Sequence, residues 1–288
     1  MTKCGARRSD SDSDVMRRLL EYTVREIRPY INWAYFYHAW QVNGTQHEGR
    51  EALQADAQRM LDDFDRDYYT KAVLMLCEAN SDGDDIVVAG KTRMPMLRQQ
   101  TPDSGDQPCL CLADFIRPVS SGKADQIGLF ATTVDRRMET EHVGDPYTRM
   151  LAQTLADRLA EATAERLHEQ VRKDLWGYGR EERLTIPQML RGEYVGIRPA
   201  VGYPSMPDTS VNFILSELLN MPEIGIRLTE SGAMRPHASV SGLLIAHPRA
   251  CYFNLGQVGD DQLADYARRR GLPVALARRF LESVLINR

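Results

Sequence analysis

The longest amphipathic pattern in the chain constrains the fold most, and it runs from Pro146 to about Trp176. Apolar side chains recur there on one broad helical face: Leu151, Leu155, Leu159, Ala162, Leu167, Val171 and Leu175. Asp145 before Pro146 is typical of a helix start, and the "GYG" that follows Trp176 is typical of a stop. The sequence therefore predicts one long helix, on which other elements can pack.

Apolar stretches bounded by turn residues predict strands in the rest of the chain. Residues 71–79 and 84–90 flank the turn sequence "SDGDD" and should form a hairpin, and 109–116 with 125–134 should add a second pair. Further strands are expected at 225–234, 239–247 and 250–258, and further helices at 15–27, 48–67, 211–221, 259–271 and 273–285. Helices and strands cluster rather than alternate, which favours an α+β fold. Residues 1–14 are polar and should be a disordered tail, followed by a domain over 15–288.

The composition argues against two classes of partner. The 36 basic and 40 acidic residues give a net charge of −4 without a dominant block of either sign, which disfavours nucleic-acid binding. No apolar run approaches the roughly 20 residues that span a bilayer. We therefore expect a cytoplasmic protein that contacts neither nucleic acid nor membrane.

Metal binding is also not expected. The five cysteines are odd in number and scattered, and Cys109 and Cys111 form a C-x-C without a second pair or a nearby histidine. Strand alternation would place both thiols on one face as small packing groups. His168 and Glu169 fall within the long helix, where a polar face is the simplest interpretation. Fingerprints for dinucleotides, for phosphate-binding loops and for zinc proteases are absent from the sequence.

The stretch "GIRPAVGYPSMPD", residues 196–208, is stiffened by prolines and glycines around Arg198 and Tyr203. Proline fixes φ and lacks a donor, while glycine opens φ values closed to other residues, so the stretch can be neither a regular helix nor a central strand. A rigid loop that carries a guanidinium and a phenol could receive an anion and a ring. A structural turn with an ordinary surface arginine is the alternative.

Nine segments, in order from residue 28 to near the end, together resemble the activation, or reactivation, domain of cobalamin-dependent methionine synthase. They are "INWAYFYHAW", "LRQQT", "CLADFI", "SGKADQIGLFA", "LADRLAEATAERLHEQVRKDLWGY", "GIRPAVGYPSMPD", "IGIRLTESGAM", "SVSGL" and "DQLADYARRRG". The resemblance implies a C-shaped single domain with a twisted antiparallel sheet and flanking helices. It also implies that S-adenosylmethionine binds in a shallow cleft, and that the domain supports the reductive methylation, or reactivation, of cob(II)alamin on a partner or module. A flavodoxin or similar reductase would supply the electron.

The same resemblance assigns ligand contacts. Arg198 would hold the carboxylate of the ligand's methionine part, and Tyr203 would lie near the methyl donor on the cobalamin-facing side. Backbone groups of Pro199, Ala200 and Gly202 would approach the ligand. The remaining contacts implied by the resemblance are Tyr252 and Phe253, which would flank the adenosine; strand core is the alternative for both, above all for Phe253.

One ligand position departs from the family pattern, and two acidic positions match it. The family usually reads I-D-W where this chain has Ile31, Asn32 and Trp33, so an amide replaces the aspartate that contacts the ligand. Asn32 can still form hydrogen bonds but offers no charge, which predicts weaker binding. Asp157 and Glu161 match acidic positions expected to dock the cobalamin module, although either could be a solvated helix charge.

The chain has no D-x-H-x-x-G segment, the cobalamin-ligating signature of the neighbouring module, and no homocysteine or folate regions. It should therefore act in trans or be one module of a longer chain, and its initial Met1 favours the first. Two other functions remain open: a stand-alone S-adenosylmethionine-dependent methyltransferase with another acceptor, and a degenerate ligand-binding or assembly protein.

Overall fold

A computed structural model describes residues 15–42, 47–102, 108–142 and 144–286. The predicted tail 1–14 lies outside these residues. The strands formed by the described residues are β1 (Met16–Thr23), β2 (Tyr69–Asp82), β3 (Asp85–Val88), β4 (Thr92–Pro95), β5 (Asp125–Val134), β6 (Arg227–Leu228), β7 (Met234–Arg235) and β8 (Ser239–Leu244). The predictions of strands at 71–79, 84–90, 125–134 and 239–247 are confirmed, and 225–234 contains only the short β6–β7 hairpin.

The helices surround the sheet and connect its strands. The α-helices are α1 (Val24–Ile27), α2 (Trp33–Ala39), α3 (His47–Asp67), α4 (Arg137–Thr140), α5 (Pro146–Gln170), α6 (Ile186–Leu190), α7 (Val211–Leu219), α8 (Asp260–Arg270) and α9 (Val274–Phe280). The shorter turns are η1 (Arg28–Tyr30), η2 (Leu112–Phe115), η3 (Val119–Ser121), the π-helical η4 (Val171–Leu175), η5 (Met221–Ile224) and η6 (Glu282–Val284). The long helix predicted at 146–176 is confirmed as α5 continued by η4, and the Asp145 carboxylate caps it by accepting from the Thr148 N–H at 3.0 Å.

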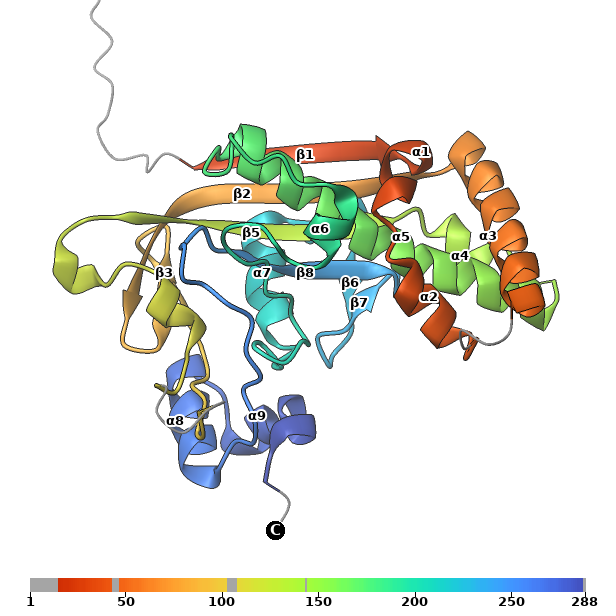
Figure 1. Ribbon diagram of the computed structural model, residues 1–288. Helices are drawn as coiled ribbons and strands as arrows, with labels where there is room; N and C mark the ends of the chain where they lie inside the picture. Colours follow the sequence, from red (N-terminus) through yellow and green to blue (C-terminus); the bar gives the residue numbers. More distant parts are fainter. Residues whose placement is uncertain (1–14, 43–46, 103–107, 143, 287–288) are drawn as a thin grey trace, which may run out of the picture.

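The large sheet is antiparallel and follows the order β4-β3-β2-β5-β8, with β1 paired to β2. Side chains alternate between its two faces along each strand. Leu74 and Phe130 belong to the core under α5, whereas their neighbours Met75 and Leu129 belong to the core under α7. In Figure 1 the sheet is the top of an arch, with α2 and α3 descending on one side and α8 and α9 on the other. The predicted α+β fold with a twisted antiparallel sheet and flanking helices is confirmed.

The predicted helix over 15–27 is wrong for most of its length. Residues Met16–Thr23 form β1, which pairs in register with β2 from Met16 opposite Leu76 to Thr23 opposite Tyr69. The helix begins only at Val24, because Thr23 and Glu26 form a capping box in which each side chain accepts from the other residue's backbone N–H. Pairing with a long central strand thus overrides the local helical pattern upstream of the cap.

The strands predicted at 109–116 and 250–258 are also wrong. The segment 109–116 contains the 3₁₀ turn η2, because the Asp114 carboxylate accepts from the Cys111 N–H at 2.9 Å and bends the chain. Cys109 and Cys111 therefore do not share a strand face, and burial raises the pKa of the Cys111 thiol to about 12. The segment 250–258 is irregular, and a single bridge joins Val258 to Leu285.

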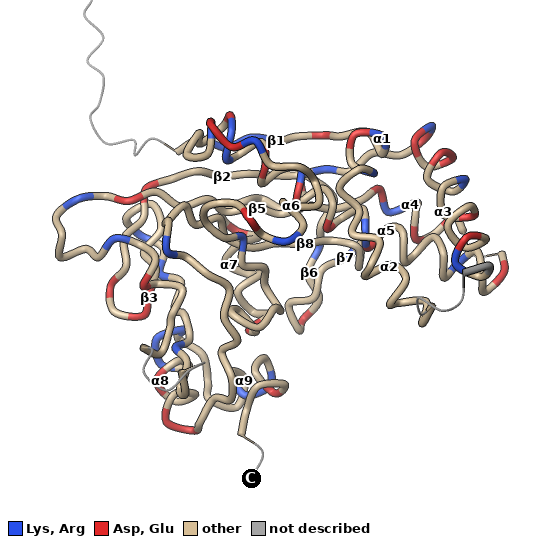
Figure 2. Tube along the Cα trace, viewed as in Figure 1, with Lys and Arg blue, Asp and Glu red and all other residues tan. Residues whose placement is uncertain are grey.

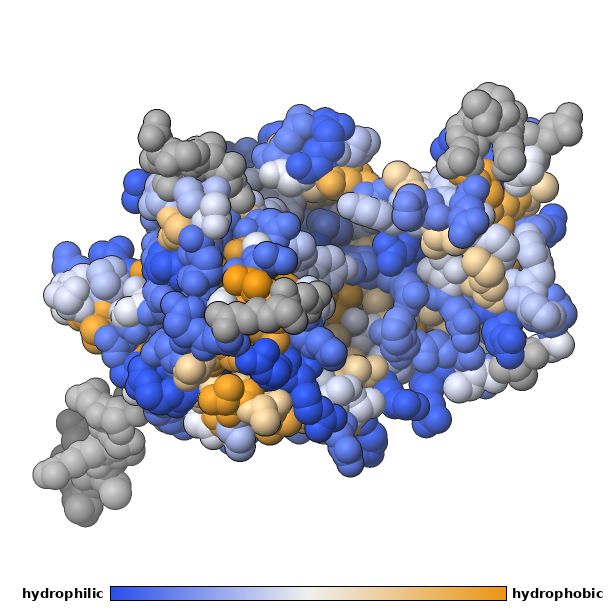
Figure 3. All heavy atoms as spheres, turned by 90° about the horizontal axis from the view of Figure 1, so that it is seen from below, coloured by the Kyte–Doolittle hydropathy of each residue, from blue (hydrophilic) through white to orange (hydrophobic). Residues whose placement is uncertain are grey.

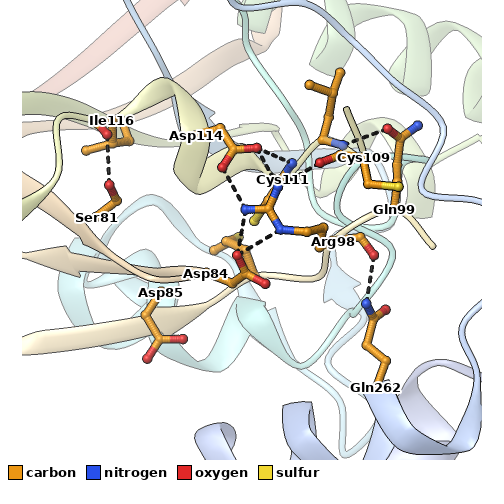
Figure 4. Close-up of polar contacts among 12 residues, drawn as sticks. Ser81, Asp84, Asp85, Arg98, Gln99, Cys109, Cys111, Asp114, Ile116 and Gln262 are labelled. Atoms are coloured by element: carbon orange, nitrogen blue, oxygen red, sulfur yellow. Dashed lines mark hydrogen bonds and ion pairs between the residues drawn. The ribbon is translucent and has the colours of Figure 1, made fainter. Parts of the chain in front are cut away.

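A polar network around Arg98 attaches the carboxy-terminal helices to the sheet (Figure 4). The Arg98 guanidinium donates to Asp84 at the β2–β3 turn and to Asp114 in η2, each at 2.6 Å. The Arg98 carbonyl accepts from the Gln262 side chain of α8 at 2.7 Å, and Gln99 donates to the Asn254 carbonyl at 2.8 Å. The network therefore joins the sheet end, η2, the 250–258 segment and α8.

Charged residues of both signs are interspersed along the described elements (Figure 2). None of the helices formed by the described residues combines the length and the apolarity needed to span a membrane.

Candidate functional site

A cleft of about 930 Å³ opens between α2, α5 and the 196–208 loop. Figure 3 shows that the face seen from below is hollowed between the part with α2 and α3 and the part with α8 and α9, and that most of this face is hydrophilic. Most of the predicted ligand residues line the cleft: Asn32, Arg198, Pro199, Ala200, Tyr203, Tyr252 and Phe253. The structure thus brings together residues from three distant parts of the chain.

The 196–208 loop is the irregular segment that its prolines and glycines predict, and it lies along the outer edge of β8. The Leu243 N–H donates to the Pro199 carbonyl at 3.0 Å, and the Val201 N–H donates to the Ser241 carbonyl at 2.9 Å. A Cβ at Gly242 would lie 2.2 Å from the Pro199 oxygen, so only glycine permits this approach. The sheet therefore fixes the loop backbone before any ligand binds.

Arg198 lies at the base of the cleft, with a side chain only 9% exposed. Its Nη2 donates to the Glu165 carboxylate of α5 at 2.5 Å. Its Nη1 is buried and has no hydrogen-bond partner among the described residues. Burial by itself would lower the pKa of Arg198, but the Glu165 carboxylate together with the nearby Tyr194 and Tyr252 outweighs it, and the pKa is raised. Arg198 therefore stays charged, and this cleft-lining residue has one buried donor without a partner among the described residues.

Tyr203 and Glu161 form a second contact between the loop and α5, one helical turn from the first. The Tyr203 hydroxyl donates to the Glu161 carboxylate, although the Tyr203 residue is 48% exposed. Partial burial and the adjacent carboxylate raise the pKa of the Tyr203 phenol. This contact forms the rim of the cleft, where solvent and partners have access.

Tyr252 and Phe253 differ in exposure and role. Tyr252 is 50% exposed, and its hydroxyl accepts from the Arg198 backbone N–H at 2.8 Å. Phe253 is 5% exposed and packs in the core beneath α7. Both line the cleft, but Phe253 is mainly a core residue and Tyr252 is the side chain that a ligand can reach.

Asn32 is the N-cap of α2, where its Oδ1 accepts from the Ala34 N–H at 3.2 Å. Aspartate and asparagine serve equally well at this position. The cap therefore does not explain the choice of an amide, and the carbonyl oxygen that a ligand could contact is already engaged with the helix backbone.

The two acidic residues predicted to dock a partner both line a small hollow beside the cleft, and only Glu161 also lines the cleft itself. Glu161 lines the cleft, whereas Asp157 lines a neighbouring hollow of about 280 Å³ to which Glu161 and Tyr203 also contribute. Asp157 Oδ1 is 3.4 Å from Nδ1 of the exposed His237. Burial raises the pKa of the Asp157 carboxyl, and the adjacent His237 opposes that shift.

Gly202 is not among the residues that line the cleft. It adopts φ +88°, and its N–H donates to the Met206 carbonyl at 2.8 Å. The glycine is therefore required by the turn itself, and its donor is engaged within the loop.

Several lining residues were not singled out from the sequence: Arg158, Glu165, Arg191 and Tyr194. Glu165 follows Glu161 by four residues on the same helix, and this spacing could have identified it. His168 is fully buried, so the polar face expected for it is wrong. Among the residues that the structure describes, no group of three or more His, Cys, Asp or Glu side chains is placed to hold a metal ion.

Comparisons with known proteins agree on one family. The sequence model of the "Vitamin B12 dependent methionine synthase, activation domain" matches residues 23–271. A crystal structure of the MetH reactivation domain bound to AdoHcy is similar over 95% of this chain and 91% of that chain, with 38% identity and a TM-score of 0.89. The chain therefore belongs to the family of activation domains of vitamin B12-dependent methionine synthase.

Proposed function

We propose that the cleft binds S-adenosylmethionine and presents its methyl group to cobalamin carried by a methionine synthase module. The observation that carries this proposal is the buried Arg198, whose Nη1 has no hydrogen-bond partner among the described residues and which lines a cleft of about 930 Å³. That volume lies within the range of roughly 300–1,000 Å³ common for small-molecule sites. The related domain bound to AdoHcy supports the same class of ligand.

The residues present fit the amino-acid end of this ligand. A guanidinium presents donors in a planar fork that matches a carboxylate, and bonds between charged groups are roughly twice as strong as neutral ones. Glu165 holds one side of the Arg198 fork, so the unpartnered Nη1 is the donor left for the ligand. Glu165 also lines the cleft and could accept from the ligand's ammonium group.

The other lining residues fit the remaining parts. The half-exposed Tyr252 offers an aromatic surface to the adenosine, and Pro199 and Ala200 form a wall without mobile side chains. Asn32 can offer only a neutral acceptor near the sulfonium or ammonium charge. Tyr203 at the rim would then lie beside the transferable methyl group.

The cobalamin module would approach over this rim. Glu161 and Asp157 lie there on one face of α5, and they are the acidic residues we propose for docking. When bound, S-adenosylmethionine supplies an electrophilic methyl group, and transfer of that group leaves S-adenosylhomocysteine as the product. A flavodoxin or similar reductase would supply the electron that the oxidised cobalamin requires.

Transfer of labelled methyl groups tests the proposal. The protein is mixed with a cob(II)alamin-bearing methionine synthase module, a chemical reductant and S-adenosylmethionine labelled at the methyl carbon. We expect the label to appear on the partner's cobalamin, and to stay on the ligand when the reductant is left out. Transfer of the label to a small-molecule acceptor would favour a stand-alone methyltransferase, and binding without transfer would favour a ligand-binding protein.

A further inference from the structure

A chain of aromatic contacts behind the cleft connects a buried arginine to Arg198. Arg172 is 0% exposed and lies in the π-helical turn η4, where the wider helical turn places its side chain inside the protein. Turns of this kind are frequent at functional sites. Arg172 Nε donates to the Glu182 carboxylate at 2.7 Å, whereas both Nη atoms are buried without a hydrogen-bond partner among the described residues.

The Arg172 guanidinium instead faces an aromatic ring. Its central carbon lies 4.3 Å from the centre of the Tyr194 ring, and the His168 ring meets Tyr194 edge-on at 4.6 Å. Glu182 also accepts from the backbone N–H of Val195 at 3.3 Å, so it holds Arg172 and the residue after Tyr194 together. The Tyr194 ring is therefore held between Arg172 and His168, and the backbone next to it is held by Glu182.

The hydroxyl group of Tyr194 continues the connection into the cleft. It lies 3.3 Å from the Tyr252 hydroxyl, which accepts from the Arg198 backbone N–H at 2.8 Å. Both tyrosines line the cleft, whereas Arg172 does not. Tyr252 comes from an irregular segment outside the sheet strands, and these two hydrogen bonds tie its hydroxyl to Tyr194 and to the Arg198 backbone.

We propose that Tyr194 is a positioning residue for the ligand's carboxylate, acting through the Tyr252 hydroxyl on Arg198. The role rests on the proposed function, because it needs a ligand whose carboxylate meets Arg198. Arg172 and Glu182 serve as the rigid support behind Tyr194. Loss of the Tyr194 hydroxyl leaves the Tyr194 ring in place but frees the Tyr252 ring to turn, and the Arg198 backbone N–H then loses its fixed acceptor.

Two ligands separate positioning of the carboxylate from general packing. S-adenosylhomocysteine carries the amino-acid tail, whereas 5′-methylthioadenosine keeps the adenosine and the thioether but lacks the carboxylate. Calorimetric titration gives the ratio of their dissociation constants for the wild type, Tyr194→Phe and Tyr252→Phe. We expect each variant to weaken S-adenosylhomocysteine binding about 3- to 10-fold, the loss of one hydrogen bond, and to leave 5′-methylthioadenosine binding within about twofold.

Tyr178→Phe is the matched control. The Tyr178 hydroxyl bonds the buried His168 Nε2 at 3.0 Å, in the same aromatic group, but Tyr178 does not line the cleft. This variant should leave the ratio unchanged, and thermal denaturation checks that all three variants are folded. Equal weakening of both ligands by Tyr194→Phe, or no weakening of either, would overturn the positioning role while leaving the proposed function intact. A wild type that binds neither ligand would overturn both.

Discussion

Two contacts join α5 to the 196–208 loop, and they differ in burial although they are one helical turn apart. Arg198 and Glu165 have side chains 9% and 15% exposed, whereas Tyr203, the partner of Glu161, is 48% exposed. The inner contact is an ion pair between groups removed from water, and the outer one is a hydrogen bond at the rim. The comparison teaches that the same helix and the same loop can provide a fixed anchor for a ligand and an accessible edge for a partner.

Removal of the inner cation should have the largest effect. Arg198→Ala deletes the carboxylate anchor and leaves Glu165 without its partner, so we expect S-adenosylmethionine affinity to fall by about 10- to 150-fold. The free energy of unfolding should fall by about 3 kcal/mol or less, because the shortened side chain lets water from the cleft reach the Glu165 carboxylate. Calorimetric titration and urea denaturation measure the two effects.

Arg198→Lys is the control for this variant, since it keeps the charge but not the fork. Its affinity should lie between those of the wild type and Arg198→Ala. Wild-type affinity in Arg198→Ala would show that the carboxylate lies elsewhere.

Acid should destabilise the inner region before the rim. Burial, with smaller contributions from Arg198 and Arg172, holds the pKa of His168 well below its ordinary value of 6.5. His168 is therefore protonated in the unfolded chain at a pH where it stays neutral in the folded protein. The free energy of unfolding falls as pH drops below about 6.5, by at most about 1.4 kcal/mol per pH unit. Glu169, whose pKa is lowered from 4.5, contributes stability that is lost only at lower pH. Urea denaturation between pH 7 and pH 5 measures the slope.

His168→Gln removes this titration and should flatten the slope over the same range. An unchanged slope in that variant would assign the acid sensitivity to other groups.

Asn32→Asp tests the charge of the cleft. The carboxylate should cap α2 as the amide does, and it adds a negative charge near a cationic ligand. We expect S-adenosylmethionine to bind about fivefold more tightly, with a smaller gain for S-adenosylhomocysteine, which lacks the sulfonium charge. Calorimetric titration of both ligands measures the difference, and equal or weaker affinity for S-adenosylmethionine would contradict this interpretation of Asn32.

The rim contact should have the smallest effect on ligand binding. Tyr203→Phe removes a hydroxyl whose partner, Glu161, can be hydrated, so ligand affinity should change by no more than about twofold and stability by less than about 1 kcal/mol. Titration and thermal denaturation measure both. A loss as large as that of Arg198→Ala would remove the distinction between the inner and outer contacts.

The sequence predicts features that depend on local rules. The Asp145 cap and the apolar spacing of 146–176 define α5, and the prolines and glycines of 196–208 define an irregular loop. The sequence could not show that Met16–Thr23 would be a strand, because that depends on pairing with β2 far along the chain. It also did not show the turn at 112–115, where the Asp114 carboxylate both accepts from the Cys111 N–H and meets Arg98.

Most of the candidate site came from family resemblance rather than from residue patterns. Local reasoning identified Arg198 and Tyr203 as possible receptors, but their pairing with Glu165 and Glu161 appears only when the loop lies along β8 opposite α5. Tyr194 and Arg172 are linked through a ring and a guanidinium in separate segments, for which the sequence has no spacing rule. Gly202 is a ligand contact according to the family resemblance, whereas in the structure its positive φ is explained by the turn within the loop.

A crystal structure of the protein with S-adenosylmethionine is the most direct test of the account. We expect the ligand's carboxylate to bond Nη1 of Arg198 and its transferable methyl carbon to face the rim formed by Tyr203 and Glu161. An empty cleft at saturating ligand, or a methyl carbon turned toward the base of the cleft, would contradict the account.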